Sequence, residues 1–329
     1  MIRTIEAHVG GQPLRLIVDG APTLTGRTMA LKRQSLERRG DALRRAVVLE
    51  PRGHADMTAA LLTEPVSPAA HAGLLFMDAD GWPALSGHAV IAATTLALER
   101  GLIVADGETL TFDTVAGAVH ARARLQVRGA DRRVDAVAVT GVPSFVLQPG
   151  YPLRAGARDL RVDVAYGGQF YAIVDAEATG IPVDGARSVE LRRLGAEICR
   201  AVNGAGIAVH PAERELSGLA GVVFTGAPND PEAHLRNVTV SAGGSIDRSP
   251  SLTGTAAVMA VLDAMGLLAD GMFVHESITG SLHRGRIVRH TQVGELDALV
   301  PEIEGTAWPT GEQTFFVDED DPLRDGFRL

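Results

Sequence analysis

Two serines in equivalent positions are the residues of this sequence best placed for chemistry. Ser86 opens a run that closes on Gly101, and Ser251, 165 residues further on, opens a run of the same length that closes on Gly266. Each run begins with small polar residues and continues almost without charge, which predicts a buried helix. The repetition suggests one active site between two related halves, with two hydroxyls on opposite sides of a ligand. Chemistry at a carbon with two faces requires that arrangement.

The start of a helix is a natural site for an anion. Its first N–H groups have no partner within the helix, and the helix dipole places partial positive charge there. Gly87, next to Ser86, lets the backbone approach a ligand closely. We therefore expect the two helix starts to hold a small carboxylate. Asp247, four residues before Ser251, is a candidate partner for an amine, and His88 for hydrogen bonding or acid–base work.

A structural interpretation of the same residues stays open. Serine before a helix is a common N-cap, Asp247 is a typical turn former, and His88 is equally suited to a structural hydrogen bond. Only the paired occurrence of the two serines favours an active site. Elsewhere, Cys199 lies in an apolar helical stretch and is expected to be a buried thiol. His283 and His290 stand among arginines and are expected at the surface.

Composition bounds the function. The 329 residues favour two domains, and the net charge of −9 argues against a nucleic-acid partner. No apolar run is long enough to span a membrane, and the N-terminus lacks the apolar core of a signal peptide. A single cysteine excludes an internal disulfide and fits a reducing compartment. We therefore expect a cytoplasmic protein with no membrane partner.

Strand-like segments outnumber helical ones and do not alternate with them, so a doubly wound parallel sheet is disfavoured. Besides the two runs that follow the serines, helices are predicted at residues 28–39 and 189–205. Strands are predicted at 2–8, 15–19, 46–50, 73–78, 109–114, 119–127, 134–140, 160–166, 169–175, 221–225, 236–241, 276–281, 286–290 and 313–318. The pattern of strands, one central helix and more strands occurs twice. It predicts an α/β (α+β) fold of two pseudo-symmetric halves, each a curled mixed sheet around its helix.

Several motifs together resemble the proline racemase family, which contains proline racemases, 4-hydroxyproline 2-epimerases and trans-3-hydroxy-L-proline dehydratases. The resemblance runs nearly end to end. Its motifs are His8-Val-Gly-Gly-Gln-Pro13, Glu50-Pro-Arg-Gly-His54, Ser86-Gly-His88, Tyr166-Gly-Gly168 with Phe170 and Tyr171, Asp247-Arg-Ser-Pro-Ser-Leu-Thr-Gly-Thr255, and Asp321-Pro-Leu-Arg-Asp-Gly-Phe327.

The resemblance implies two domains of the diaminopimelate-epimerase-like type, with the ligand cleft between them and no metal or other cofactor. We place the first domain at residues 1–125, with 306–329 returning to it, and the second at 126–305. By position, Ser86 and Ser251 take the two acid/base places. The ligand-binding places fall to Gly87, His88, Asp247, Leu252 and Thr253. The implied partner is a proline-type imino acid, and a homodimer is compatible with the resemblance.

Three departures from the family pattern bear on the reaction. Serine replaces both catalytic cysteines, and a hydroxyl becomes a useful base only with a partner. Leu252 replaces a glycine and adds bulk beside the ligand. Gly87-His-Ala89 is similar to the dehydratase branch rather than the epimerase branch. We therefore expect dehydration of trans-3-hydroxy-L-proline to pyrroline-2-carboxylate. The alternatives are 4-hydroxyproline 2-epimerase or proline racemase activity, and imino-acid binding without catalysis.

Overall fold

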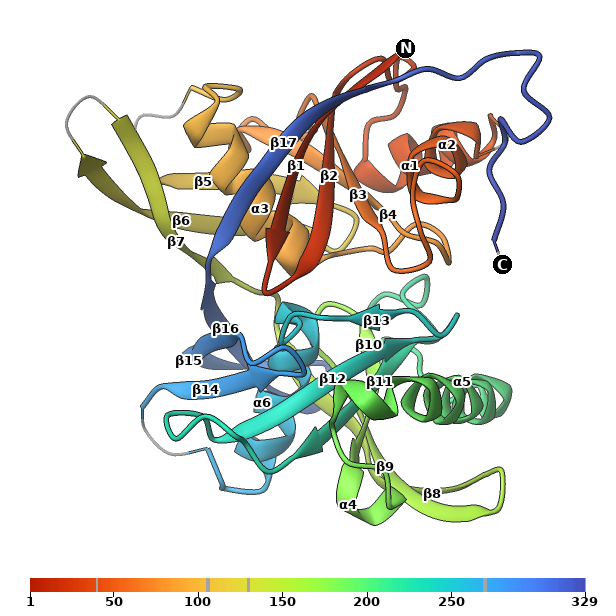
Figure 1. Cartoon of the computed structure of the whole chain (residues 1–329). Helices are drawn as coiled ribbons and strands as arrows, with labels where there is room; N and C mark the ends of the chain where they lie inside the picture. Colours follow the sequence, from red (N-terminus) through yellow and green to blue (C-terminus); the bar gives the residue numbers. More distant parts are fainter. Residues whose placement is uncertain (40, 105–106, 129–130, 269–270, 329) are drawn as a thin grey trace. The chain divides into compact units, whose positions relative to one another are not determined.

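The chain divides into two compact units that we describe separately. The computed structural model describes residues 1–39, 41–104, 107–128, 131–268 and 271–328. The first unit contains Met1–Val139 together with Gly305–Leu329, and the second contains Thr140–Glu304 (Figure 1). The first boundary lies later in the chain than the expected 125–126. Strand β7 (Asp131–Thr140) belongs to the first unit up to Val139, and its Val134 N–H donates to Glu99 Oε1 of that unit at 2.9 Å.

The first unit is a mixed sheet around helix α3 (Gly87–Glu99). In spatial order its strands are β17 (Ala307–Phe315), β1 (Ile2–Val9), β2 (Gln12–Asp19), β3 (Thr58–Thr63), β4 (Ala72–Met77), β5 (Thr109–Thr114) and β6 (Gly117–Arg128). The β2–β3 and β4–β5 pairs are parallel and the other neighbours are antiparallel. Helix α3 contacts β17, β1, β2, β3 and β6, so the sheet curls around it.

The second unit has the same plan around helix α6 (Leu252–Ala264). Its strands are β8 (Ser144–Ala155), β9 (Arg158–Tyr166), β10 (Phe170–Asp175), β11 (Leu219–Gly226), β12 (Leu235–Ser241), β14 (Phe273–Ser277), β15 (Leu282–Val293) and β16 (Leu296–Gly305). Strand β16 pairs with β8 and closes the sheet on itself, while the short β13 (Ile246–Asp247) lies beside β12. Helix α6 contacts β8, β9, β10 and β15.

The two sheets repeat one pairing pattern. From β17 to β6 the neighbours run antiparallel, antiparallel, parallel, antiparallel, parallel, antiparallel, and the series from β8 to β15 is identical. Parallel neighbours need a crossover connection. Helices α1 (Met29–Glu37) and α2 (Ala42–Val48) lie in the crossover from β2 to β3. Helices α4 (Ala176–Thr179) and α5 (Ser188–Ala205) lie in the equivalent crossover from β10 to β11. The predicted duplication is therefore present in the topology of each unit.

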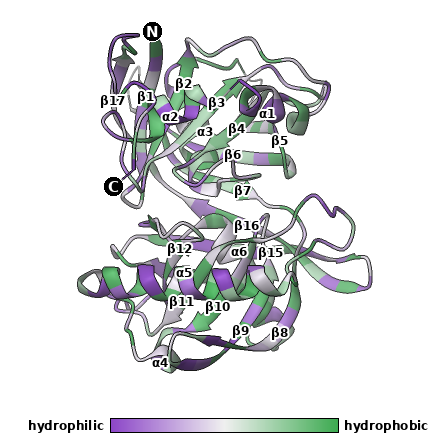
Figure 2. Ribbon diagram, turned by 90° about the vertical axis from the view of Figure 1, so that its right-hand side faces the viewer, coloured by the Kyte–Doolittle hydropathy of each residue, from purple (hydrophilic) through white to green (hydrophobic). Residues whose placement is uncertain are grey.

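Burial explains why the central helices differ from α5. Residues 87–97 of α3 and 252–261 of α6 are all buried, as expected of helices that are apolar on every side. Helix α5 buries only one stripe, which includes Leu191, Ile198 and Cys199, and Figure 2 shows polar and apolar residues alternating along it. Cys199 is buried as predicted.

Two expectations about single segments are wrong. Residues 46–50 were expected as a strand, but Ala46, Val47 and Val48 end the short helix α2 and are buried in the first unit's core. Packing outweighs the β preference of the valines there. His283 was expected at the surface and is buried, whereas His290 is exposed.

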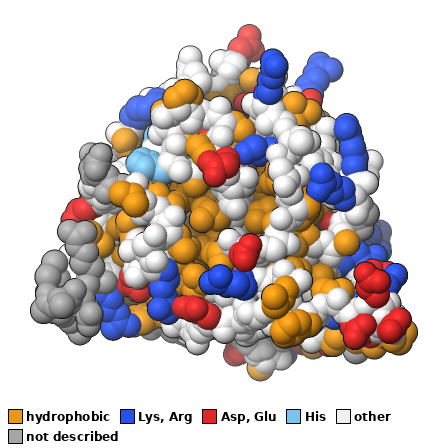
Figure 3. Space-filling view, turned by 90° about the horizontal axis from the view of Figure 1, so that it is seen from above, with side chains coloured by type: hydrophobic (Ala, Val, Ile, Leu, Met, Phe, Trp, Pro, Cys, Tyr) orange, Lys and Arg blue, Asp and Glu red, His pale blue; other side chains and the backbone are white. Residues whose placement is uncertain are grey.

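On the described part of the face in Figure 3, Lys and Arg side chains are interspersed with Asp and Glu.

Two motifs of the sequence meet in the first unit. The loop around Arg52 receives the C-terminal segment, because Phe327 N–H donates to Glu50 O at 2.9 Å. Arg52 itself donates from Nε to Ala46 O at 2.9 Å and binds the carbonyl of Arg324. Gly53 N–H bonds Leu49 O at 2.8 Å, which brings the loop against the end of α2. These motif residues therefore connect the loop with the C-terminal segment and with the end of α2.

Gly53 should not tolerate a side chain. A Cβ at this position would lie 2.0 Å from Val48 O, whereas at Gly185, our control, it would meet nothing within 4 Å. Neither glycine has a positive φ. We expect Gly53→Ala to lower the free energy of unfolding by about 1–3 kcal/mol through overpacking, and Gly185→Ala to leave it nearly unchanged. Urea unfolding followed by circular dichroism measures both. Equal stability of the two variants would contradict this account of the loop.

Candidate functional site

Ser86 precedes α3 with a hydroxyl that is not used as a helix cap. Its backbone is extended, its carbonyl accepts Val90 N–H at 3.0 Å, and its side chain makes no capping hydrogen bond. Instead Ser86 Oγ lies 3.4 Å from Nδ1 of His88, and both residues are buried. This long contact brings an imidazole nitrogen to the hydroxyl. A neutral imidazole is a group that can take a hydroxyl proton.

Ser251 precedes α6 in a different conformation. Its φ is +61°. Among the described residues other than glycine, only Asp41 also has a positive φ. Its Oγ accepts Gly254 N–H at 3.2 Å, so this serine is a true N-cap. An N–H donated to the oxygen stabilises the alkoxide that remains when the hydroxyl gives up its proton. The two predicted acid/base serines therefore have different surroundings.

The turn before Ser251 uses Asp247. Oδ1 of Asp247 accepts the Ser249 N–H at 2.9 Å and the Ser249 Oγ–H at 2.7 Å. Ser249 Oγ in turn accepts the Ser251 N–H at 3.2 Å. The turn-forming interpretation of Asp247 is thus present in the structure, and a bond to a substrate amine stays a prediction for this carboxylate.

The first turn of α6 is held by the strand pair β9–β10. The Thr253 hydroxyl and the Tyr171 hydroxyl lie 2.7 Å apart and share a hydrogen bond. Gly167 packs so closely that a Cβ there would lie 2.2 Å from Thr253 O and 2.6 Å from Ala257 N. Leu252 is buried at the first position of the helix. The glycine of the Tyr-Gly-Gly motif therefore permits the helix start to sit against the sheet.

A buried polar network lies behind the Ser251 turn. Asn237 Nδ2 donates to Pro250 O at 2.7 Å, and the Thr255 hydroxyl lies 3.0 Å from the same carbonyl oxygen. Nδ1 of His275 is 2.9 Å from Thr255 Oγ1. Burial, followed by the charge of His283, lowers the pKa of His275 to about 3. The imidazole is therefore neutral near pH 7.

The structure groups the predicted residues in two sets. Ser86, Gly87 and His88 are consecutive in the first unit, while Asp247, Ser251, Leu252 and Thr253 lie within one turn and helix start of the second. Sequence reasoning assigned no role to Ser249 and Tyr171, although both lie within motifs of the resemblance. Asn237 and His275 carried no signal, because they stand in ordinary strand sequence.

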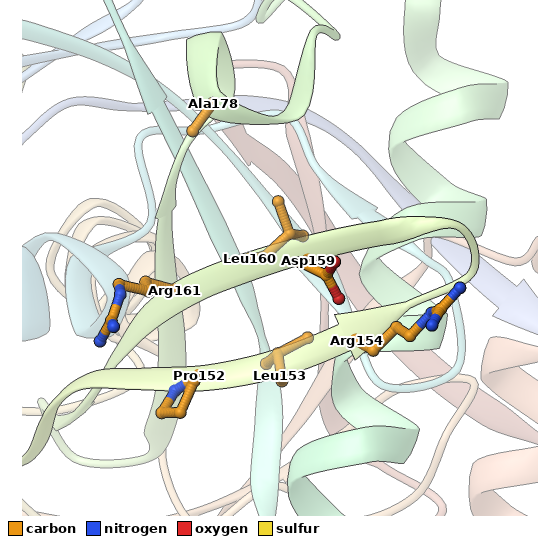
Figure 4. Close-up of a pocket in the computed structure, with 7 residues that line it drawn as sticks. All are labelled: Pro152, Leu153, Arg154, Asp159, Leu160, Arg161 and Ala178. Carbon is orange, nitrogen blue, oxygen red and sulfur yellow. The ribbon is translucent and has the colours of Figure 1, made fainter.

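Two surface hollows of the second unit lie away from these residues. One, shown in Figure 4, is lined by side chains of the β8–β9 hairpin and by Ala178 of α4. The other lies between α4 and the loop that follows β11 and includes Arg236. Neither hollow is lined by Asp247, Ser251, Leu252 or Thr253.

Comparison with known proteins gives one consistent family. The sequence pattern of the family described as proline racemase matches residues 4–328. A trans-3-hydroxy-L-proline dehydratase of Bacillus cereus is 39% identical, covering 99% of this chain and 97% of the relative. A 4-hydroxyproline 2-epimerase of Ancylobacter novellus is 38% identical, with 98% and 97% covered. A proline racemase of Acetoanaerobium sticklandii is 36% identical, with 100% and 98% covered.

Solved structures agree with the predicted fold class. A hydroxyproline epimerase from Agrobacterium vitis, with bound trans-4-OH-L-proline, has a TM-score of 0.92 and 32% identity over 100% of this chain and 94% of the other. A phenazine biosynthesis protein of the PhzF family from Bacillus anthracis has a TM-score of 0.60 at 13% identity, covering 96% and 99%, which shows the fold alone. The diaminopimelate-epimerase-like fold class is thus confirmed.

In the described part of the chain, no helix is both long and apolar enough to cross a membrane.

The two serines should differ in what they contribute to stability. Ser251→Ala removes a capping bond, which typically costs about 1 kcal/mol, while Ser86→Ala removes only the 3.4 Å contact with His88. We expect Ser251→Ala to lower the free energy of unfolding by more than Ser86→Ala does. Urea unfolding of both variants tests this. A larger loss in Ser86→Ala would show that the capping assignments are reversed.

His275 should make the protein sensitive to acid. An unfolded histidine binds its proton near pH 6.5, whereas folded His275 binds one only near pH 3. The unfolded chain therefore takes up more protons between these values, and stability is full above pH 6.5 and falls as the pH drops towards 3. We expect His275→Gln to reduce the loss of stability between pH 7 and pH 5 by about 1–2 kcal/mol. Urea unfolding of the variant and of the wild-type protein at pH 7 and pH 5 measures this, and an unchanged pH dependence in His275→Gln would contradict this account of His275.

Proposed function

Because this chain belongs to the proline racemase family, we propose that it removes the α-proton of a proline-type imino acid, and that its reaction is the dehydration of trans-3-hydroxy-L-proline to pyrroline-2-carboxylate. The Cα–H bond and the Cβ–O bond break, a Cα=Cβ bond forms, and water leaves. The resulting enamine then tautomerises to the ring imine. The reaction thus needs one base for the α-proton and one donor for the leaving hydroxide.

The unequal surroundings of the two serines are the observation that carries this proposal. Ser86 Oγ has an imidazole nitrogen at 3.4 Å, whereas Ser251 Oγ accepts a backbone N–H. His88 supplies the partner that a hydroxyl needs to act as a base. The bond from Gly254 favours loss of the Ser251 proton, which suits a donor. Leaving hydroxide is a strong enough base to accept a proton from a serine hydroxyl.

Epimerisation is less suited to this pair. An epimerase runs in both directions, so by microscopic reversibility each of its two groups must act as base in one direction and as acid in the other. Within the described residues of the second unit, no histidine nitrogen bonds to Ser251 Oγ. Elimination avoids this demand because a single base suffices. The 39% identity to a trans-3-hydroxy-L-proline dehydratase supports the same choice.

The remaining predicted residues bind the substrate in this proposal. The N–H groups of Gly87 and His88 and those of Leu252 and Thr253 belong to the first turns of α3 and α6, where intrahelical partners are lacking. We assign them to the substrate carboxylate. Tyr171 fixes the Thr253 side chain, and we assign the ring amine to the Asp247 carboxylate.

Proton NMR in D₂O tests the reaction. The protein is incubated separately with proline, both 4-hydroxyproline epimers and trans-3-hydroxy-L-proline. We expect only trans-3-hydroxy-L-proline to be consumed, with the ring imine as product. Deuterium uptake with formation of the other epimer would instead establish an epimerase or racemase. Binding seen by calorimetry without any change of substrate would establish a non-catalytic binding protein, and either result would overturn the proposal.

Variants of Ser86 and of its partner His88 test the mechanism. Ser86→Ala and His88→Gln should each lower kcat by about 10²–10⁴-fold, because general-base catalysis contributes that much. Ser144→Ala is a matched control, because Ser144 is buried like Ser86 but its hydroxyl donates to a backbone carbonyl, Val142 O, at 3.1 Å. It should retain wild-type turnover. Full activity in Ser86→Ala would remove Ser86 as the base.

A further inference from the structure

Ser251 is held in a backbone conformation that serine does not choose by itself. A positive φ in a residue with a Cβ is strained and persists only where the surroundings enforce it. At +61° the φ of Ser251 differs from the −133° of Ser86, although the two residues occupy equivalent places before their helices. Something specific to the second unit must therefore impose the conformation.

The peptide unit between Pro250 and Ser251 is bonded on both of its edges. Its carbonyl oxygen is 2.7 Å from Asn237 Nδ2 and 3.0 Å from Thr255 Oγ1. Its N–H, on the opposite edge, donates to Ser249 Oγ at 3.2 Å. Because a peptide is planar, bonds at both edges fix its rotation. That rotation determines the φ of Ser251 and with it the direction of the side chain.

His275 lies behind Thr255 and Asn237, with Nδ1 2.9 Å from Thr255 Oγ1 and 3.4 Å from Asn237 Nδ2. If the Thr255 hydroxyl donates to Pro250 O, then Nδ1 of His275 must be the protonated nitrogen and donate to Thr255 Oγ1. Asn237, Thr255 and His275 are all fully buried. In such surroundings a hydrogen bond is stronger than in water, and the loss of one member of the network leaves its partners unpaired.

The first unit has no counterpart to this arrangement. In the repeat, Val90 occupies the place of Thr255 and Ala84 the place of Ser249, and neither side chain can hydrogen-bond. The bonds on the Pro250–Ser251 peptide are therefore not a general requirement of the helix start. They accompany the one serine whose φ is positive.

We propose that Asn237, Ser249 and Thr255, with His275 behind Thr255, form a peptide clamp that positions the Ser251 hydroxyl for proton donation. These are positioning residues and need not touch the substrate. The inference rests on the proposed function in one respect only, the role of Ser251 in turnover. The clamp itself is a statement about the backbone and has its own measurement.

Thr255→Val tests the clamp with little change in shape. It removes the bonds to Pro250 O and to His275 but keeps the branched side chain. We expect kcat on trans-3-hydroxy-L-proline to fall roughly 10- to 100-fold, since small misplacements of a catalytic group have effects of that size. KM should change less than threefold, and Thr255→Ser should restore most of kcat. Thr95→Val is the matched control, because Thr95 is equally buried and its hydroxyl bonds only Ile91 O of its own helix.

Ser249→Ala tests the other edge of the same peptide. It should lower kcat with KM nearly unchanged, and it remains informative if Thr255→Val fails to fold. Wild-type turnover in folded Thr255→Val or in Ser249→Ala would overturn the proposal. So would a loss in Thr95→Val as large as that in Thr255→Val.

Amide hydrogen exchange of Ser251 separates this proposal from the proposed function. We expect exchange to be at least tenfold faster in Thr255→Val and Ser249→Ala than in the wild type, and unchanged in Thr95→Val. If the wild type turns over none of the substrates, the proposed function fails while this measurement still decides whether the clamp exists. Unchanged exchange in both clamp variants would refute the clamp even in an active enzyme.

Discussion

A helix with no polar side must be covered on every side, and this constraint shapes each unit of the protein. Eleven consecutive residues of α3 and ten of α6 are buried. A flat sheet covers only one face of a helix, so each sheet has to curl, and the second one closes through the β16–β8 pair. Each unit has two pairs of parallel strands, and each of these pairs requires a crossover connection. The identical pairing series in the two units is the outcome of meeting one packing demand twice.

The same constraint puts the polar chemistry at the helix starts. Most side chains of the two central helices are apolar, and the Thr94 and Thr95 hydroxyls of α3 bond carbonyls of their own helix. The other buried polar side chains, His88, Thr253 and Thr255, lie in the first turns. The first-turn N–H groups lack partners within the helix, and they are polar groups that the wrapped helix still offers. A sheet curled around a helix therefore leaves the helix start as the place where our proposal puts the substrate carboxylate, with the two serines just before it.

Sequence reasoning reached the parts of the fold that rest on local pattern. The uncharged runs after Ser86 and Ser251 predicted the central helices, and the amphipathic pattern of residues 189–205 predicted α5. It was wrong at residues 46–50, where a valine-rich segment is helical because its buried face completes the first unit's core. The site was predicted only in outline. Which serine is a cap, and which lies beside an imidazole, depends on backbone angles that residue type does not determine.

The matched serines show why equivalent positions need not have equivalent roles. At Ser86 the extended backbone leaves the hydroxyl near His88, two residues along the chain. At Ser251 the peptide is bonded by partners 2, 4 and 14 residues away in sequence, and Thr255 among them contacts His275, 20 residues further on. Those contacts exist only after β12 and β14 have paired. The duplication thus supplies two similar helix starts, while tertiary contacts give Ser251 surroundings that differ from those of Ser86, and in our proposal this difference makes Ser251 the donor. In our proposal, two hydroxyls in such different surroundings serve as the base and the proton donor of an elimination, and neither role requires a cysteine.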